Sequence, residues 1–368
     1  MKQFIHTLSV AFFLLLGACT EATISIGGEG DDGVGDTEKG VPLNVKNLGL
    51  SVEIESRSIV TGGPVGDATN PNPLTSVGLC VTKGNGSVYA SGNTTQVFTY
   101  NTQANPAVWE LAPDEETLLL FSEKGTVYAF APSEKSVSLS GSPKVPLMNG
   151  VKVLDKQKFS FYDQGASVDA STDILWETDQ DDYLYYKAST TVDRWSPEVS
   201  PVMHHALAKV SFRILEADGG SAFTGSLVKK VVLKSSGGFK KSTSAKLSLA
   251  SGELSGTMTA VNELSFTADG DMRVIGTNVT EAKTVPVQAF GLVIPVTGVA
   301  VTLELTLDDN RVFTMSPSAN GAPGTFTATW QKGNNYIYNI RMAPQGVVIA
   351  DMEVAGWNDG GSADVPVE

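Results

Sequence analysis

Cysteine and histidine are nearly absent from this chain, which has two cysteines and three histidines in 368 residues. Cys19 and Cys80 cannot build the disulfide framework of a small secreted domain. A histidine zinc site needs three or four ligands, and His6 lies in the N-terminal apolar region. The sequence also lacks a phosphate loop, a dinucleotide fingerprint, an HExxH motif and a serine-hydrolase elbow. We therefore expect a protein that is not an enzyme, with no catalytic residues, no metal and no cofactor.

Positive charge is also scarce. Lysine and arginine number 26 against 40 aspartates and glutamates, and the formal net charge is −14. Binding to nucleic acid requires a basic surface that releases counterions, so nucleic acid is excluded as a partner.

Few stretches have helical periodicity, whereas 37 glycines accompany many threonines, serines and valines. That composition favours an all-β fold. The length exceeds the roughly 250–300 residues at which one core stops growing, which favours two domains.

No apolar run reaches the roughly 20 residues that a membrane-spanning helix needs. Leu8–Leu16 follows Lys2 and has the length of a signal-peptide core. It ends in Leu16-Gly17-Ala18-Cys19, which resembles the lipobox of bacterial lipoproteins; the alternative is an ordinary secretory signal with an incidental cysteine. We predict a signal peptide over residues 1–18 and acylation of Cys19, for example by palmitate, which would anchor the chain in the outer membrane. Residues 19–43 are glycine-rich and acidic, and they predict a flexible tether.

The stretch 47–62 separates this tether from the folded chain. Four apolar residues alternate in it with glycine, serine and glutamate: Leu48, Leu50, Val52 and Ile54. This period of two predicts a half-buried strand. Arg57-Ser58 follows directly, and Arg57 is the first arginine of the sequence. A basic residue just past an N-terminal strand is either a strand-end charge or a site where a protease detaches that strand.

Further strands are expected throughout the rest of the chain, separated by proline, glycine and asparagine turn signals. They fall at 76–82, 97–100, 118–121, 127–130, 173–176, 183–186, 227–234, 245–249, 263–266, 290–295, 301–307, 311–315, 336–342 and 347–357. The loop 216–220 marks the predicted boundary between an N-terminal β-sandwich domain, 44–215, and a C-terminal one, 216–368.

Three local features invite a chemical interpretation. Cys80 lies inside an alternating strand without a basic neighbour, so we predict a buried, unpaired thiol. His204 and His205 are predicted to be packed or hydrogen-bonded strand residues. The acidic turn 177–182 is expected to be solvated.

Several landmarks together resemble the fimbrillin-like family, the subunits of type V pili. They are the lipobox ending in Cys19, ESRSIVTG at 55–62, TVYAFAP at 126–132, DILW at 173–176, HHALAKVSF at 204–212, LVIP at 292–295, the pattern WxxGxxYxYxI from Trp330 to Ile340, and a last strand ending in Trp357. The resemblance implies two transthyretin-like β-sandwich domains in tandem, export as a lipoprotein, and an arginine-specific protease that cuts after Arg57.

Loss of the first strand is then expected to open a groove that a strand of another subunit fills. The expected partners are other pilin subunits, the outer membrane through the lipid anchor, and surface ligands of a host or of bacteria. Stalk, anchor and tip subunits share these features. The alternative from another class is a monomeric surface lipoprotein that binds glycans and keeps its N-terminal strand; a hydrolase ranks third.

The lipid site gives a first testable prediction. Cys19→Ser is expected to abolish acylation because the thiol accepts the acyl chain, which leaves an unprocessed precursor or a soluble protein. Metabolic labelling with a radioactive fatty acid measures this, with Cys80→Ser as the matched control that keeps the label. Undiminished labelling of Cys19→Ser would contradict the assignment.

Overall fold

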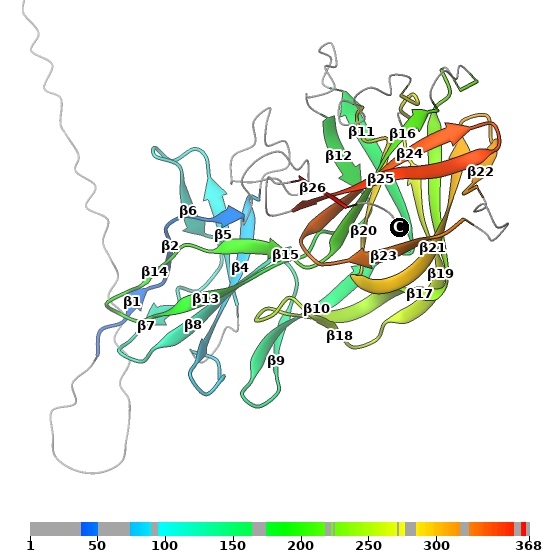
Figure 1. The fold of residues 1–368 in the computed structure, drawn as a ribbon. Coiled ribbons are helices and arrows are strands. Elements are labelled where there is room, and N and C mark those ends of the chain that lie inside the picture. The colour runs from blue at the N-terminus through cyan, green and yellow to red at the C-terminus, as the bar shows by residue number, and fades with distance from the viewer. Residues whose placement is uncertain are drawn as a thin grey trace, which may run out of the picture.

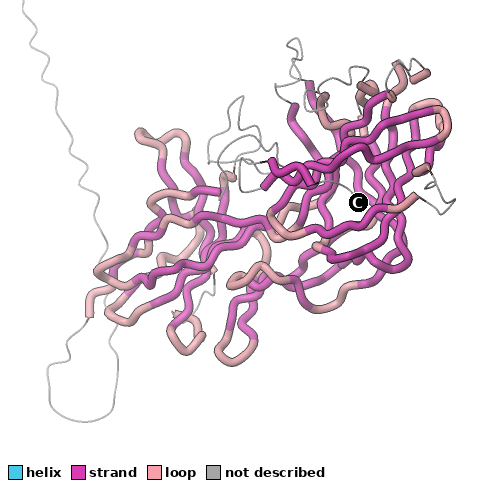
Figure 2. Tube along the Cα trace, viewed as in Figure 1, coloured by secondary structure: helices cyan, strands magenta, loops and turns pink. Residues whose placement is uncertain are grey.

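The structure is a computed structural model that describes residues 38–50, 74–89, 95–163, 174–217, 222–223, 225–270, 272–276, 285–316, 324–356 and 362–365. Figure 2 shows strands joined by loops, and the described residues contain no helix. The all-β prediction is confirmed. Figure 1 shows two adjoining groups of strands, with β1–β8 and β13–β15 in the first and the remaining strands in the second.

The first group is built on a seven-stranded sheet. Its strands, in spatial order, are β3 (Gly49–Leu50), β15 (Val202–His205), β13 (Leu184–Val192), β8 (Gly125–Ala131), β4 (Ser76–Lys83), β5 (Gln96–Asn101) and β6 (Val108–Leu111). Two short pairs accompany it. They are β1 (Val41–Pro42) with β7 (Leu119–Leu120), and β2 (Asn44–Val45) with β14 (Glu198–Val199).

The second group contains a ten-stranded sheet and a five-stranded sheet. The ten-stranded sheet consists of β9 (Val137–Ser140), β10 (Val145–Val153), β11 (Lys156–Asp163), β12 (Ile174–Thr178), β17 (Val228–Ser248), β18 (Leu254–Ser255), β19 (Thr259–Ala268), β21 (Val296–Leu307), β22 (Val312–Thr314) and β23 (Phe326–Trp330). The five-stranded sheet has the order β20 (Ala289–Val293), β16 (Ala208–Glu216), β24 (Asn334–Ala343), β25 (Gly346–Gly356) and β26 (Ser362–Val365).

The largest core combines inward-facing residues of these two sheets, as in a β-sandwich. The Trp330 ring stacks on Phe239 with 5.7 Å between ring centroids, and its Nε1 donates a 2.8 Å hydrogen bond to the hydroxyl of Tyr338. Burial raises the pKa of that tyrosine. A second core lies in the seven-stranded group. A third cluster joins Cys80 and Phe130 to residues of β10, β17 and β20.

The predicted inward faces are confirmed for two strands. Val301, Leu303, Leu305 and Leu307 of β21 are fully buried, as are the alternating residues of β24 from Tyr336 to Met342. In β25 the predicted face is wrong at its start. Val347 and Ile349 are buried there, while Val348 is 50% exposed. A register shift opposite Asn339 and Ile340 reverses the faces before Met352, because one extra residue flips every side chain that follows.

The two strands predicted at 227–234 and 245–249 form one long strand, β17. The turn signal between them, Ser235–Gly238, is a bulge at which the pairing with β19 shifts while the strand continues. Gly237 has a φ of 71° there, a left-handed conformation that favours glycine.

Sheet pairing crosses the predicted domain boundary at residue 216. β10 and β11 precede that residue, yet they hydrogen-bond to β17 and β19, which follow it. The division at residue 216 is therefore not confirmed. The folded part also begins before residue 44, because β1 pairs with β7 and Leu43 is buried, so the expectation of a flexible tether does not hold for 41–43.

The close approach of two strands at Gly78 gives a prediction about stability. A Cβ atom added there would overlap the buried ring of Phe130, which lies opposite on β8. Gly78→Ala is expected to lower the free energy of unfolding by about 1–3 kcal/mol, because a packed core resists added volume. Denaturant unfolding measures the change. Gly84→Ala is the control, since nothing lies within 4 Å of its added Cβ; equal stability of the two variants would contradict the packing.

Candidate functional site

The N-terminal segment, residues 38–50, follows the seven-stranded group and pairs with three of its strands (Figure 1, blue). β1 runs antiparallel to β7, whereas β2 and β3 run parallel to β14 and β15. The backbone N–H groups of Leu43, Asn44 and Lys46 donate to the carbonyl groups of Leu118, Pro197 and Val199 at 2.9, 2.9 and 3.0 Å. Backbone hydrogen bonds therefore connect the segment to chain that lies more than 70 residues away.

Apolar side chains attach the segment to the core. Leu43, Val45 and Leu48 are 5%, 3% and 6% exposed and belong to the core of the seven-stranded group. Asn44 and Lys46 between them point outward and are exposed. Three buried side chains at about 1.5–3 kcal/mol each contribute roughly 4.5–9 kcal/mol to docking, before the cost of ordering the segment.

Charged residues lie along the outside of the segment. Glu38 faces Arg194 at 3.6 Å, and hydrogen bonds from Ser122 lower the pKa of its carboxyl group, with Arg194 adding to this. Lys46 pairs with Glu198 at 3.3 Å, but both side chains are more than half exposed. Exposed pairs of this kind are worth little, so the apolar contacts dominate the docking.

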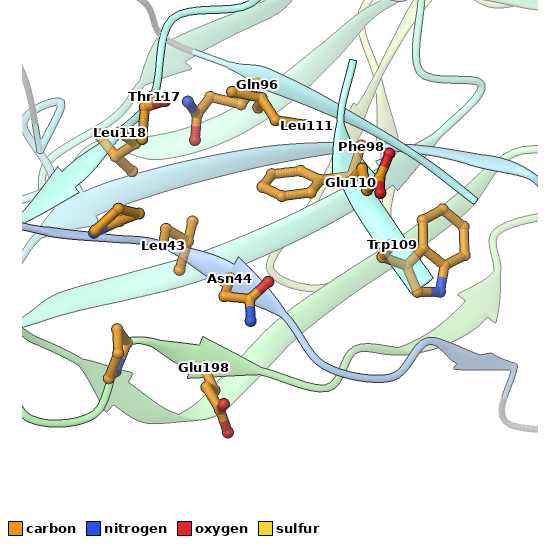
Figure 3. A pocket seen from close by; sticks show the side chains of 12 residues that line it. Leu43, Asn44, Gln96, Phe98, Trp109, Glu110, Leu111, Thr117, Leu118 and Glu198 are labelled. Atoms are coloured by element: carbon orange, nitrogen blue, oxygen red, sulfur yellow. The ribbon is translucent and has the colours of Figure 1, made fainter. Parts of the chain in front are cut away.

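A cavity of about 500 Å³ opens beside β2 (Figure 3). One wall comes from the N-terminal segment at 42–44 and the other from β5, β6 and the chain around Leu118. Figure 3 shows Leu43 and Phe98 on opposite sides of the space, with the amide of Gln96 above it. Gln96 is 5% exposed. Its Nε2 donates to the carbonyl oxygen of Glu116, while its Oε1 is buried without a hydrogen-bond partner in the described part of the chain.

The structure describes only some of the site residues that the sequence predicts. Leu48 is buried and Leu50 lies in β3, the edge strand beside β15. Val52 and Ile54, the predicted processing site Arg57-Ser58 and the predicted lipid site Cys19 lie outside the described residues.

Sequence reasoning missed the first part of the docked segment. Residues 41–46 read Val-Pro-Leu-Asn-Val-Lys, and their alternation was the available signal. This signal is weak because the glycine-rich stretch that precedes it has almost nothing to bury.

The histidine pair follows the sequence interpretation. His205 Nδ1 lies 2.9 Å from Asp182 Oδ2, and the two side chains are 0% and 1% exposed. Burial lowers the pKa of His204. The expectation of a solvated acidic turn is wrong for Asp182, because the turn before β13 folds back onto β15. The pair is shielded from solvent and joins the turn before β13 to strand β15.

Cys80 is a free, buried cysteine, as predicted. Burial raises the pKa of its thiol to about 12, so the reactive thiolate is not formed at neutral pH. Within the described ranges, no group of three or more histidine, cysteine, aspartate or glutamate side chains could hold a metal ion. Those ranges also contain no helix that is long and apolar enough to span a membrane.

The three tryptophans whose side chains the structure describes divide into two buried rings and one exposed ring. Trp109 and Trp330 are 5% and 1% exposed and belong to the two large cores. Trp195 is 69% exposed. It lies in a tight turn in which Asp193 Oδ1 accepts hydrogen bonds from the backbone N–H groups of Trp195 and Ser196 at 2.9 and 3.0 Å. The turn presents this ring to solvent next to the N-terminal segment, because Arg194 pairs with Glu38.

The fold and the docked segment define a class: an all-β protein that completes one core with a segment from its own N-terminal region. A family model described as fimbrillin-like matches residues 68–357. The chain belongs to the fimbrillin-like family.

Solved structures with a similar fold come from Bacteroidales. A candidate cell adhesion protein from Bacteroides ovatus has 17% identity and a TM-score of 0.50, over 89% of this chain and 99% of that one. One from Bacteroides uniformis has 18% identity and a TM-score of 0.46, over 86% and 99%. A fimbrial protein from Bacteroides vulgatus has 14% identity and a TM-score of 0.45, over 85% and 99%. No curated protein matches the chain.

The docked segment gives a prediction about stability. Leu43→Ala is expected to lower the free energy of unfolding by about 2–5 kcal/mol, because it leaves a cavity in the core of the seven-stranded group. The control is Asn47→Ala at an exposed position of the same segment, which should stay within about 0.5 kcal/mol. Denaturant unfolding compares the two, and equal effects would show that the segment is not held by apolar burial.

Proposed function

We propose that this protein is a subunit of a cell-surface fimbrium, a type V pilus. It is exported as an outer-membrane lipoprotein on Cys19, and cleavage after Arg57 by an arginine-specific protease starts its assembly by strand exchange. Membership in the fimbrillin-like family supports the fimbrial role. The observation that carries the mechanism is the docking of residues 38–50 through three buried apolar side chains, upstream of Arg57.

Cleavage after Arg57 changes how this segment is held. Before the cut, the covalent link keeps the segment at a high effective concentration next to its groove. After the cut, only the backbone hydrogen bonds and the burial of Leu43, Val45 and Leu48 retain it. A strand from another subunit that offers the same alternation can then add to β15 and β14 by β-augmentation. The partners are therefore other pilin subunits, of the same or a related kind.

A second candidate function is a monomeric surface lipoprotein that binds glycans. The observation in its favour is Trp195, whose exposed ring is held on a hydrogen-bonded turn. Such a ring could also bind surface ligands of a host or of other bacteria as part of a fimbrium. The two functions differ in the size of the mature surface product, a ladder of oligomers for a pilin and a monomer for a glycan-binding lipoprotein.

The processing site gives the decisive prediction. Arg57→Ala in cells that have the protease is expected to yield a lipidated, folded monomer with the N-terminal segment still docked, because the covalent link persists. The measurement is the ladder of denaturant-resistant oligomers on a gel run without boiling.

Ser58→Ala is the matched control, because it keeps the arginine and should keep the ladder. A ladder of equal strength from Arg57→Ala would rule out protease-triggered exchange at this site. A wild-type protein that stays monomeric after the cut would favour the glycan-binding candidate.

A further inference from the structure

The cavity beside β2 has one wall that leaves with the N-terminal segment and one that stays. Pro42, Leu43 and Asn44 form the first wall and lie upstream of Arg57. Phe98 of β5 and Leu111 of β6 belong to the second, which no cut at Arg57 removes. The cavity is therefore already open next to the segment while the segment is still in place (Figure 3).

Unpaired strand edges border this cavity. β6 is the last strand of the seven-stranded sheet, and among the described residues it pairs only with β5. β2 pairs only with β14 in the same residues, and it approaches β6 without a ladder between them. An extended chain that entered here would lie alongside the edge of the resident segment.

The lining matches a peptide strand in its chemistry. Leu43, Phe98, Leu111 and Leu118 offer apolar surface, and Gln96 Oε1 is a buried acceptor without a partner in the described chain. Because the Gln96 Nε2 is bound to the Glu116 carbonyl group, the oxygen is left for a donor in the cavity. An extended peptide supplies an apolar side chain, which can pack against the apolar lining, and a backbone N–H, which can donate to Gln96 Oε1.

We propose that this cavity, lined by Leu43, Gln96, Phe98, Leu111 and Leu118, is the first docking point for the incoming strand of a second fimbrial subunit. This inference rests on the proposed function. The incoming strand inserts one apolar residue beside the resident segment, donates a hydrogen bond to Gln96, and then displaces β2 and β3 residue by residue. The occupant is a subunit strand because the cavity borders the segment that such a strand replaces.

The docking point predicts how the rate of strand exchange depends on subunit concentration. If exchange begins by docking, its initial rate per molecule rises in proportion to subunit concentration, because two molecules meet before the resident segment leaves. If the segment must first dissociate by itself, the initial rate per molecule is independent of concentration. The two routes end in the same assembly and differ only in this order of reaction.

The experiment uses the full-length protein, purified in detergent and cut with an arginine-specific protease, with N-terminal sequencing to confirm the cut. Oligomer formation is followed over time at several protein concentrations on gels without boiling. Thr117→Trp covers the mouth of the cavity from an exposed rim position that faces no core. It is expected to slow the initial rate about tenfold, the loss that corresponds to burial of one apolar side chain in the docking step.

Thr325→Trp is the matched control. Thr325 is also exposed and lines a second cavity, of about 390 Å³, next to β17, β19 and β21 of the ten-stranded sheet. Its initial rate should stay within about twofold of wild type, since an exposed substitution away from the docking step has little effect. Unchanged thermal unfolding of both variants shows that they fold, and Leu111→Ser, which makes the cavity polar, should slow exchange in the same direction.

The outcomes separate the two claims. If wild-type protein does not form oligomers after the cut, the proposed function fails. If it forms oligomers at a rate per molecule that does not depend on concentration, or if Thr117→Trp and Leu111→Ser assemble as fast as wild type, the docking point is wrong while the fimbrial function stands. Binding of a small glycan that Thr117→Trp blocks, without any effect on assembly, would assign the cavity to a sugar instead.

Discussion

Burial of Leu43, Val45 and Leu48 is the contact that completes the core of the seven-stranded group. The segment that carries them is held by its alternating side chains and by hydrogen bonds to chain around Leu118 and Val199. Burial and hydrogen bonding hold the segment in place, and none of these contacts is covalent. In the proposed assembly, a related strand that alternates in the same way would satisfy the same groups.

The group formed by the ten-stranded and five-stranded sheets has a core of its own. Its two sheets enclose a core with Trp330, Phe239 and Tyr338 at its centre, and this core does not include the N-terminal segment. β17 takes part in both regions, because Val231 and Leu233 face this core while Ala245 and Leu247 belong to the cluster that joins the two groups. Gln157 adds a polar connection between the sheets, since its side chain hydrogen-bonds both the N–H and the carbonyl oxygen of Leu292. Loss of the segment therefore opens one core and leaves the other closed.

Several buried polar side chains pair with one another across elements that are distant in sequence. His205 Nδ1 lies 2.9 Å from Asp182 Oδ2, and Arg213 Nη1 donates to Glu353 Oε1 at 2.8 Å, so both pairs bring polar atoms together where water is excluded. Gln96 Oε1 is one of several buried oxygen and nitrogen atoms without a hydrogen-bond partner in the described residues, and Gln96 lines the cavity beside β2.

The sequence by itself determined the all-β class, the inward faces of β21 and β24, and the buried state of Cys80, because each depends on a period of two or on local composition. It also identified the family through the order of its motifs. It did not find β10 and β11, nor the path of 41–46, since their partners lie far away in the chain and only tertiary pairing selects them. Tertiary structure alone decided that Val348 faces outward, because the bulge opposite Asn339 depends on the partner strand. It also decided that Asp182 is buried and Trp195 exposed, because burial depends on which distant element packs against a residue, and that information is not local.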